Sequence, residues 1–125
     1  MSPTADMHRV DTLLSHVWMV RTFLKHSDEA QEDAELAEVH RELYDYMLAL
    51  GGYFQEGDAP NYLRTASKKL AKLRRATEHF REIQPEVSTH MNFQMAVQSL
   101  TVAVLEIGRI LEGTGNQGSG MKDQG

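Results

Sequence analysis

The feature that most constrains the fold is the spacing of apolar residues, which recurs with the period of an α-helix in four separate stretches of the chain. Apolar residues three and four positions apart form one stripe along a helix, and that stripe faces a core. The first stretch covers about residues 4–26, and the second begins near Asp28. Their stripes are Val10, Leu13, Leu14, Val17, Val20 and Leu24, and Leu36, Val39, Leu43, Tyr46, Met47, Leu50 and Phe54.

The third stretch runs from Asp58 to about Ile83 and the fourth from Pro85 to about Glu112. Their stripes are Leu63, Ala66, Leu70, Leu73, Thr77 and Phe80, and Phe93, Ala96, Val97, Leu100, Val104, Ile107 and Leu111. No stretch shows the strict alternation that is typical of strands. Four helices of roughly 20 to 27 residues with short connections favour an all-α, up-down-up-down antiparallel four-helix bundle.

The predicted helix boundaries come from capping residues and helix breakers. Asp28 opens a capping box and predicts the start of the second helix. Gly57 predicts the end of that helix, and Asp58 followed by Pro60 predicts the start of the third. Pro85 predicts the break that separates the third helix from the fourth.

The C-terminal segment, residues 113–125, reads GTGNQGSGMKDQG and has no apolar periodicity. Gly113 predicts a left-handed cap at the end of the fourth helix. A glycine-rich segment that buries no apolar surface cannot offset the entropy lost on ordering. We therefore expect one bundle domain, residues 1–112, followed by a disordered, flexible tail, residues 113–125.

Composition excludes several classes of chemistry. The chain has 125 residues and no cysteine, so it cannot form disulfides, a thiolate nucleophile or a thiolate metal site. It shows no basic start followed by an unbroken apolar run, and polar residues interrupt the most apolar segment, residues 95–111. These features argue against a signal peptide and a membrane span, so we expect a cytoplasmic protein.

No catalytic, metal or cofactor motif is recognisable. The chain has six histidines, but no glutamate lies three residues before any of them, unlike the ligand pairs of di-metal bundles. It also has no Gly-x-Ser-x-Gly elbow and no phosphate-binding glycine loop followed by a helix. We expect no catalytic residue, no metal and no cofactor.

A second hypothesis rests on polar residues near the apolar stripes. Arg21, His40 and Arg74 lie within about 60–70° of the apolar centres of their helices, close enough to reach a cleft with Tyr44 and His90. The arginines would bind an anionic group and the histidines would exchange protons, as in a small-molecule-binding or hydrolytic bundle. We favour the alternative, in which the arginine stems cover the core edge and their charged groups reach water.

A third hypothesis rests on a basic stripe along the predicted third helix, at spacings of three and four residues. The stripe consists of Arg64, Lys68, Lys72, Arg75 and His79. A nucleic-acid accessory role is disfavoured because aromatic residues do not interleave the stripe and the net charge is -5. Its alternative target is the acidic run from Asp28 to Glu38, and such a face is most often simply solvated.

The fourth helix has more apolar residues than one stripe holds. The surplus consists of Met91, Met95, Val102 and Leu105. A helix in an isolated bundle hides one stripe, so a surplus predicts contact with another molecule unless Trp18, Phe23 and long side chains cover it. The leading hypothesis is a non-enzymatic protein that acts through protein–protein contacts, as a homo-oligomer or an adaptor.

Overall fold

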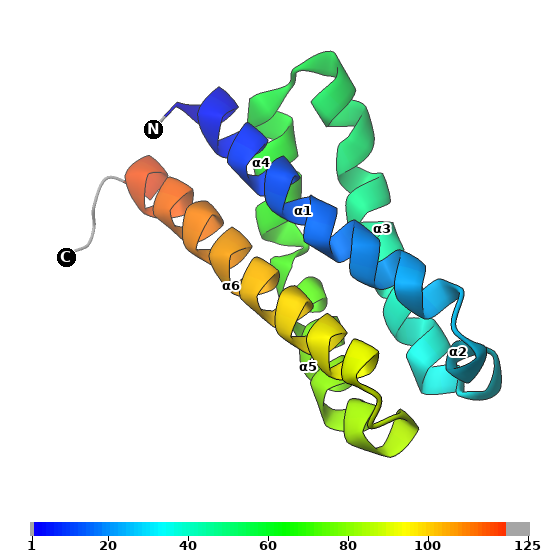
Figure 1. Cartoon of the computed structure of the whole chain (residues 1–125). Coiled ribbons are helices and arrows are strands. Elements are labelled where there is room, and N and C mark those ends of the chain that lie inside the picture. The colour runs from blue at the N-terminus through cyan, green and yellow to red at the C-terminus, as the bar shows by residue number, and fades with distance from the viewer. Residues whose placement is uncertain (1, 120–125) are drawn as a thin grey trace.

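The protein is all-α, with six helices packed antiparallel (Figure 1). The computed structural model describes the backbone of residues 2–119 and the side chains of residues 2–113. The helices are α1 (Pro3–Lys25), α2 (Asp28–Glu32), α3 (Ala34–Glu56), α4 (Ala59–Lys68), α5 (Leu70–Val87) and α6 (Met91–Ser119). Helices α1 and α5 each contact both α3 and α6, so α3 and α6 lie diagonally across the structure (Figure 1).

The predicted apolar stripes form the core. Every stripe residue is buried except Leu13, Met47, Phe54 and Val97, which are partly buried and pack against the core. Helical periodicity therefore gave the correct inward face of each long helix. The core also contains large side chains outside the predicted stripes, including Met7, Tyr62 and Ile110.

The predicted start of the second long helix at Asp28 is wrong, because the segment forms two helices. Ser27 Oγ accepts a hydrogen bond from the Ala30 amide and begins the short helix α2. Asp33 then adopts extended backbone angles, and its Oδ1 accepts from the Leu36 amide at 3.0 Å to begin α3. Two side-chain caps six residues apart compete for the backbone, and each begins its own helix.

The predicted third helix is divided between α4 and α5 at Lys69, where φ is -98° and ψ is 4°. At this break the buried Tyr46 hydroxyl of α3 donates to the Ala66 carbonyl at 2.9 Å. A side chain that inserts into the backbone ladder is a recognised cause of a helix break. The interruption therefore arises from a contact with α3 and not from a local glycine or proline.

Pro85 does not separate the last two long helices, contrary to the prediction, because it lies inside α5. A proline in the final turn removes only one backbone hydrogen bond. The side chain of Gln84 closes this turn by donating through Nε2 to the Ser88 carbonyl at 2.8 Å. Helix α5 therefore continues to Val87, and α6 starts after a short connection.

The two predicted glycine stops have different outcomes. Gly57 ends α3 in the left-handed conformation, with φ 70°, and Asp58 begins α4 by accepting from the Asn61 amide, as predicted. The predicted end at Glu112 is wrong, since α6 continues to Ser119. Glycine permits a left-handed cap without requiring one, and no proline follows to stop the next turn. The rest of the predicted tail, residues 120–125, lies outside the described residues.

Candidate functional site

The outward side of α6 carries a row of exposed apolar residues. Its core stripe faces α1 and α5, whereas the predicted surplus residues stay exposed: Met91 58%, Met95 46%, Val102 66% and Leu105 53%. Gln98 completes the row and is also exposed. We call these five residues the α6 outer face. Their spacings alternate between four and three residues, which places them along one line of a helix and is typical of a helix–helix seam.

Neither Trp18 nor Phe23 hides this face. The ring of Phe23 meets that of Phe93 edge-on, with centroids 5.0 Å apart, and so contacts the inner side of α6. Trp18 lies beside Tyr44 of α3, with ring centroids 6.5 Å apart. The covered-helix alternative is therefore wrong, because the surplus side chains are still about half exposed.

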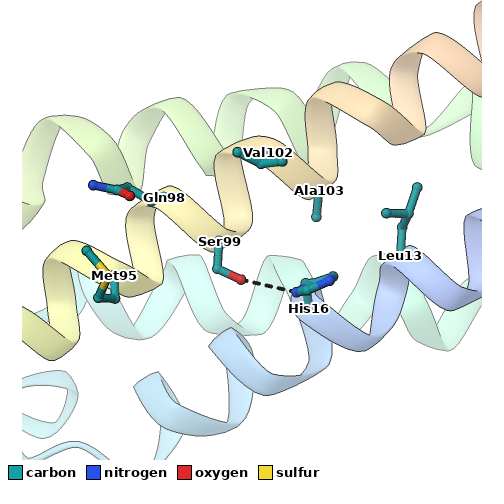
Figure 2. A pocket seen from close by; sticks show the side chains of 7 residues that line it. All are labelled: Leu13, His16, Met95, Gln98, Ser99, Val102 and Ala103. Carbon is teal, nitrogen blue, oxygen red and sulfur yellow. Dashed lines mark hydrogen bonds between the residues drawn. The ribbon is translucent and has the colours of Figure 1, made fainter.

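A groove between α1 and α6 adjoins the α6 outer face. Its volume is about 410 Å³, and Figure 2 shows residues of both helices along it. Inside it, Ser99 Oγ and His16 Nδ1 form a hydrogen bond of 3.3 Å that links the two helices (Figure 2). The lining residues are Leu13, His16, Met95, Gln98, Ser99, Val102 and Ala103.

A second hollow, of about 300 Å³, continues this groove, because Met95 and Ser99 line both. It brings in Phe23 and Met19 of α1, and the Met19 side chain is 66% exposed. Methionine side chains adapt their shape to a partner at little cost. The apolar surface therefore extends from α6 across to α1.

Arg21 and Tyr44, two of the five predicted cleft residues, come together where α1 packs on α3. The Arg21 Cζ atom lies 4.5 Å from the ring centroid of Tyr44 and 4.9 Å from that of Trp18. An arginine between two aromatic rings is stabilised by cation–π attraction. The charged end of Arg21 thus contacts aromatic rings, and its Nε atom is buried without a hydrogen-bond partner among the described residues, whereas the alternative expected this charged group to reach water.

His40, a third predicted cleft residue, lies on α3 one turn before Tyr44. Burial lowers the pKa of its imidazole below 6.5, and the neighbouring cations Arg41, Arg21 and Lys25 lower it further. The positive potential at this seam and the partial desolvation of the ring both favour neutral His40.

The remaining two cleft residues do not join this group. The Arg74 guanidinium lies over Gly108 of α6 and donates to Glu112 Oε2 at 3.1 Å. His90 lies in the connection before α6, where its Nδ1 accepts from the Asn92 amide at 3.0 Å and helps to begin the helix. The fold thus distributes over three locations five side chains whose positions on single helices predicted one cleft.

The predicted basic stripe is divided by the break at Lys69, which leaves Arg64 and Lys68 on α4 and the other members on α5. Lys68, Lys72 and Arg75 are exposed, and Arg64 donates to the Asn61 side chain at 2.7 Å. The Nε2 atom of His79 lies 3.5 Å from Glu35 Oε2. One end of the stripe thus contacts the acidic run within the same chain, as one alternative expected.

Two further properties of the chain concern metal binding and membrane insertion. No group of three or more histidine, cysteine, aspartate or glutamate residues that could hold a metal ion occurs in the described part of the chain. By length and composition alone, the segment Met91–Gly113 is apolar enough to cross a membrane, contrary to the expectation for residues 95–111. About 44% of its most apolar window is buried in the structure, where it serves as a core helix.

The interhelical part of the surface was not predicted from the sequence. His16 and Met19 belong to it only because α1 lies against α6, and their own spacing gives no such signal. The regular spacing of the α6 outer face, in contrast, is visible in the sequence. This spacing is a signal for a helix–helix contact along one line of α6, in addition to the surplus of apolar residues.

The chain matches no protein-family model, no curated protein and no solved structure. Any functional assignment therefore rests on the α6 outer face and the adjoining α1–α6 groove.

Proposed function

We propose that this protein is a non-enzymatic helical-bundle protein that acts through protein–protein contacts, either with copies of itself or as an adaptor. The proposed contact surface is the α6 outer face together with the adjoining α1–α6 groove. In this proposal the consecutive helices α4 and α5 form one arm of an up-down-up-down, four-membered bundle. The observation that carries the proposal is the exposure of large apolar side chains on a helix whose other side already forms the core.

The exposed apolar residues are concentrated on one side of the molecule. Seven large hydrophobic side chains are exposed among the described residues, and five of them belong to α6 or to the adjacent part of α1. Those five are Met19, Met91, Met95, Val102 and Leu105. Single exposed apolar residues are normal, but a contiguous group of this kind is typical of an interaction site.

The size of the apolar surface is sufficient for association. Five side chains that are about half exposed offer roughly 500 Å², comparable with the largest apolar patches of monomeric proteins. At about 25 cal/mol per Å², covering that area contributes roughly 12 kcal/mol per molecule. A complex also covers the contact surface of the partner, so the gain from both sides can offset the 4–15 kcal/mol or so that association costs in lost motion, and shape complementarity in the groove decides the affinity.

The two competing functions have weaker support. A small-molecule or hydrolytic cleft requires Arg74 and His90 beside Arg21, whereas each of them binds another part of the chain. A nucleic-acid role requires a continuous basic surface, whereas the stripe is broken at Lys69 and the chain carries a net charge of -5.

The test compares two sets of glutamate substitutions. Met95→Glu with Leu105→Glu places two charges on the proposed surface, and Leu48→Glu places one on α3, where Leu48 is 63% exposed. Sedimentation and affinity capture should show that the double variant loses self-association or partner binding while Leu48→Glu retains it. Far-ultraviolet circular dichroism confirms that all three proteins are helical. A wild type that neither self-associates nor captures a partner refutes the proposal, and so does a double variant that associates as the wild type does.

A further inference from the structure

We infer that the α6 outer face binds the same face of a second copy, with the two α6 helices antiparallel about a two-fold axis that passes near Gln98. This inference rests on the proposed function and names its partner. It follows from the symmetry of the exposed row, from the residue at its centre and from the distribution of charge.

The exposed row is nearly symmetric about Gln98. Met91 lies seven residues before Gln98, and Leu105 lies seven residues after it. Met95 lies three residues before Gln98, and Val102 lies four residues after it. At a rise of about 1.5 Å per residue, the outer two residues lie about 10 Å on either side of the centre. An antiparallel second copy therefore places its Leu105 level with Met91, and its Val102 within about 1.5 Å of the level of Met95. A two-fold interface requires this reciprocity.

Gln98 suits a position on the axis. A residue on a two-fold axis meets its own copy, so a charged residue there would repel itself. A glutamine side chain both donates and accepts hydrogen bonds, so two copies can bond to each other. An entirely apolar partner helix would instead leave this amide buried without a partner, which is costly.

The charge distribution also favours a second copy. No charged residue occurs between Met91 and Leu105, and the first two charges beyond them, Glu106 and Arg109, pair with each other at 3.2 Å. A partner of opposite charge would find no counter-charge on this face. The acidic run, residues 28–38, lies on α2 and the start of α3, diagonally across from α6 (Figure 1). Two copies of this acidic protein can therefore meet through α6 with their acidic segments far apart.

The expected dimer is weak and reversible. The α6 outer face and the adjoining groove supply far fewer residues per copy than the roughly 20–30 residues that each partner contributes to a standard interface. The polar residues His16 and Ser99 add a rim along the groove. We expect a dissociation constant in the micromolar range or above, detected as a mass that rises with protein concentration.

Engineered cysteines test the geometry directly, because the chain has none of its own. Gln98→Cys should form a disulfide-linked dimer on mild oxidation, about tenfold faster than the α3 control Leu48→Cys. Met91→Cys and Leu105→Cys alone should not cross-link, since each lies about 21 Å along the axis from its copy and a disulfide needs Cα atoms within about 7 Å. An equal mixture of the last two variants should cross-link to each other. Self-linking of Met91→Cys as fast as in the mixture indicates another alignment and overturns the inference.

The outcomes separate this inference from the proposed function. A wild type that dimerises through the α6 outer face with a different cross-linking pattern overturns the inference and leaves the proposed function standing. The same conclusion holds for a monomeric wild type that captures another protein and loses it on the double glutamate substitution. A monomeric wild type that captures nothing, or that binds phosphatidylcholine–phosphatidylglycerol vesicles through this face instead, overturns both.

Discussion

Replacing Tyr46 with phenylalanine removes one atom at the break between α4 and α5. The Tyr46 hydroxyl donates to the Ala66 carbonyl at 2.9 Å, and the residue is only 3% exposed. Burial raises the pKa of this phenol above its ordinary value, so the hydroxyl keeps its proton and acts as a donor throughout the range in which the protein is handled. Phenylalanine fills the same space, and the substitution therefore isolates the hydrogen bond.

The expected cost follows from the position of this bond. A typical buried hydrogen bond contributes about 1 kcal/mol, and a carbonyl left without a partner in the core costs about 1–3 kcal/mol. Water has little access to the site, so we expect Tyr46→Phe to lower the free energy of unfolding by about 1.5–2.5 kcal/mol. For a chain of 125 residues, each kcal/mol lowers Tm by about 4 °C, which gives a decrease of about 6–10 °C.

Urea and thermal unfolding followed by circular dichroism measure this change. The matched control is Tyr44→Phe, since Tyr44 is partly buried and its ring contacts Arg21. The control should stay within about 0.5 kcal/mol of the wild type, as is usual for substitutions outside the core. Equal stability of the two variants would refute the role of the Tyr46 hydroxyl at the helix break. Faster amide exchange at residues 69–72 in Tyr46→Phe alone would locate the effect there.

Three other substitutions test local features, each through the midpoint of urea unfolding. Asp33→Ala removes the cap of α3 and should lower the free energy of unfolding by about 1 kcal/mol. Asp28→Ala, in the first turn of α2, should lower it by less than half as much. A larger effect of Asp28→Ala would show that the long helix begins at Asp28. Because burial and nearby cations lower the pKa of folded His40, its contribution to stability is complete above pH 6.5 and declines as the pH falls towards the folded pKa. His40→Gln should therefore flatten the decrease in stability below pH 6.5, and an unchanged slope would contradict this. Gly108→Ala adds a methyl group beneath the flexible Arg74 side chain. The gain in helix propensity, about 0.5–1 kcal/mol, should equal or exceed the loss of an exposed ion pair, and a loss above 1 kcal/mol would show that the methyl group is not accommodated.

The sequence by itself determined the features that depend on neighbouring residues. The inward stripe of each long helix follows from apolar spacing, which the helix geometry converts directly into one face. The stop at Gly57 and the start at Asp58 follow from backbone freedom and side-chain capping within one turn. The exposure of the surplus residues on α6 was predictable for the same reason, since the core stripe already occupies the opposite side of that helix.

Contacts between distant segments decided the rest. The break at Lys69 depends on Tyr46, which lies on another helix, and nothing in the local sequence of the third stretch indicates it. Arg21 and Arg74 have similar positions on their own helices, yet one lies between aromatic rings and the other pairs with Glu112. Helical spacing specifies which side of a helix a residue occupies, but only the packing of the helices determines which neighbours that side meets.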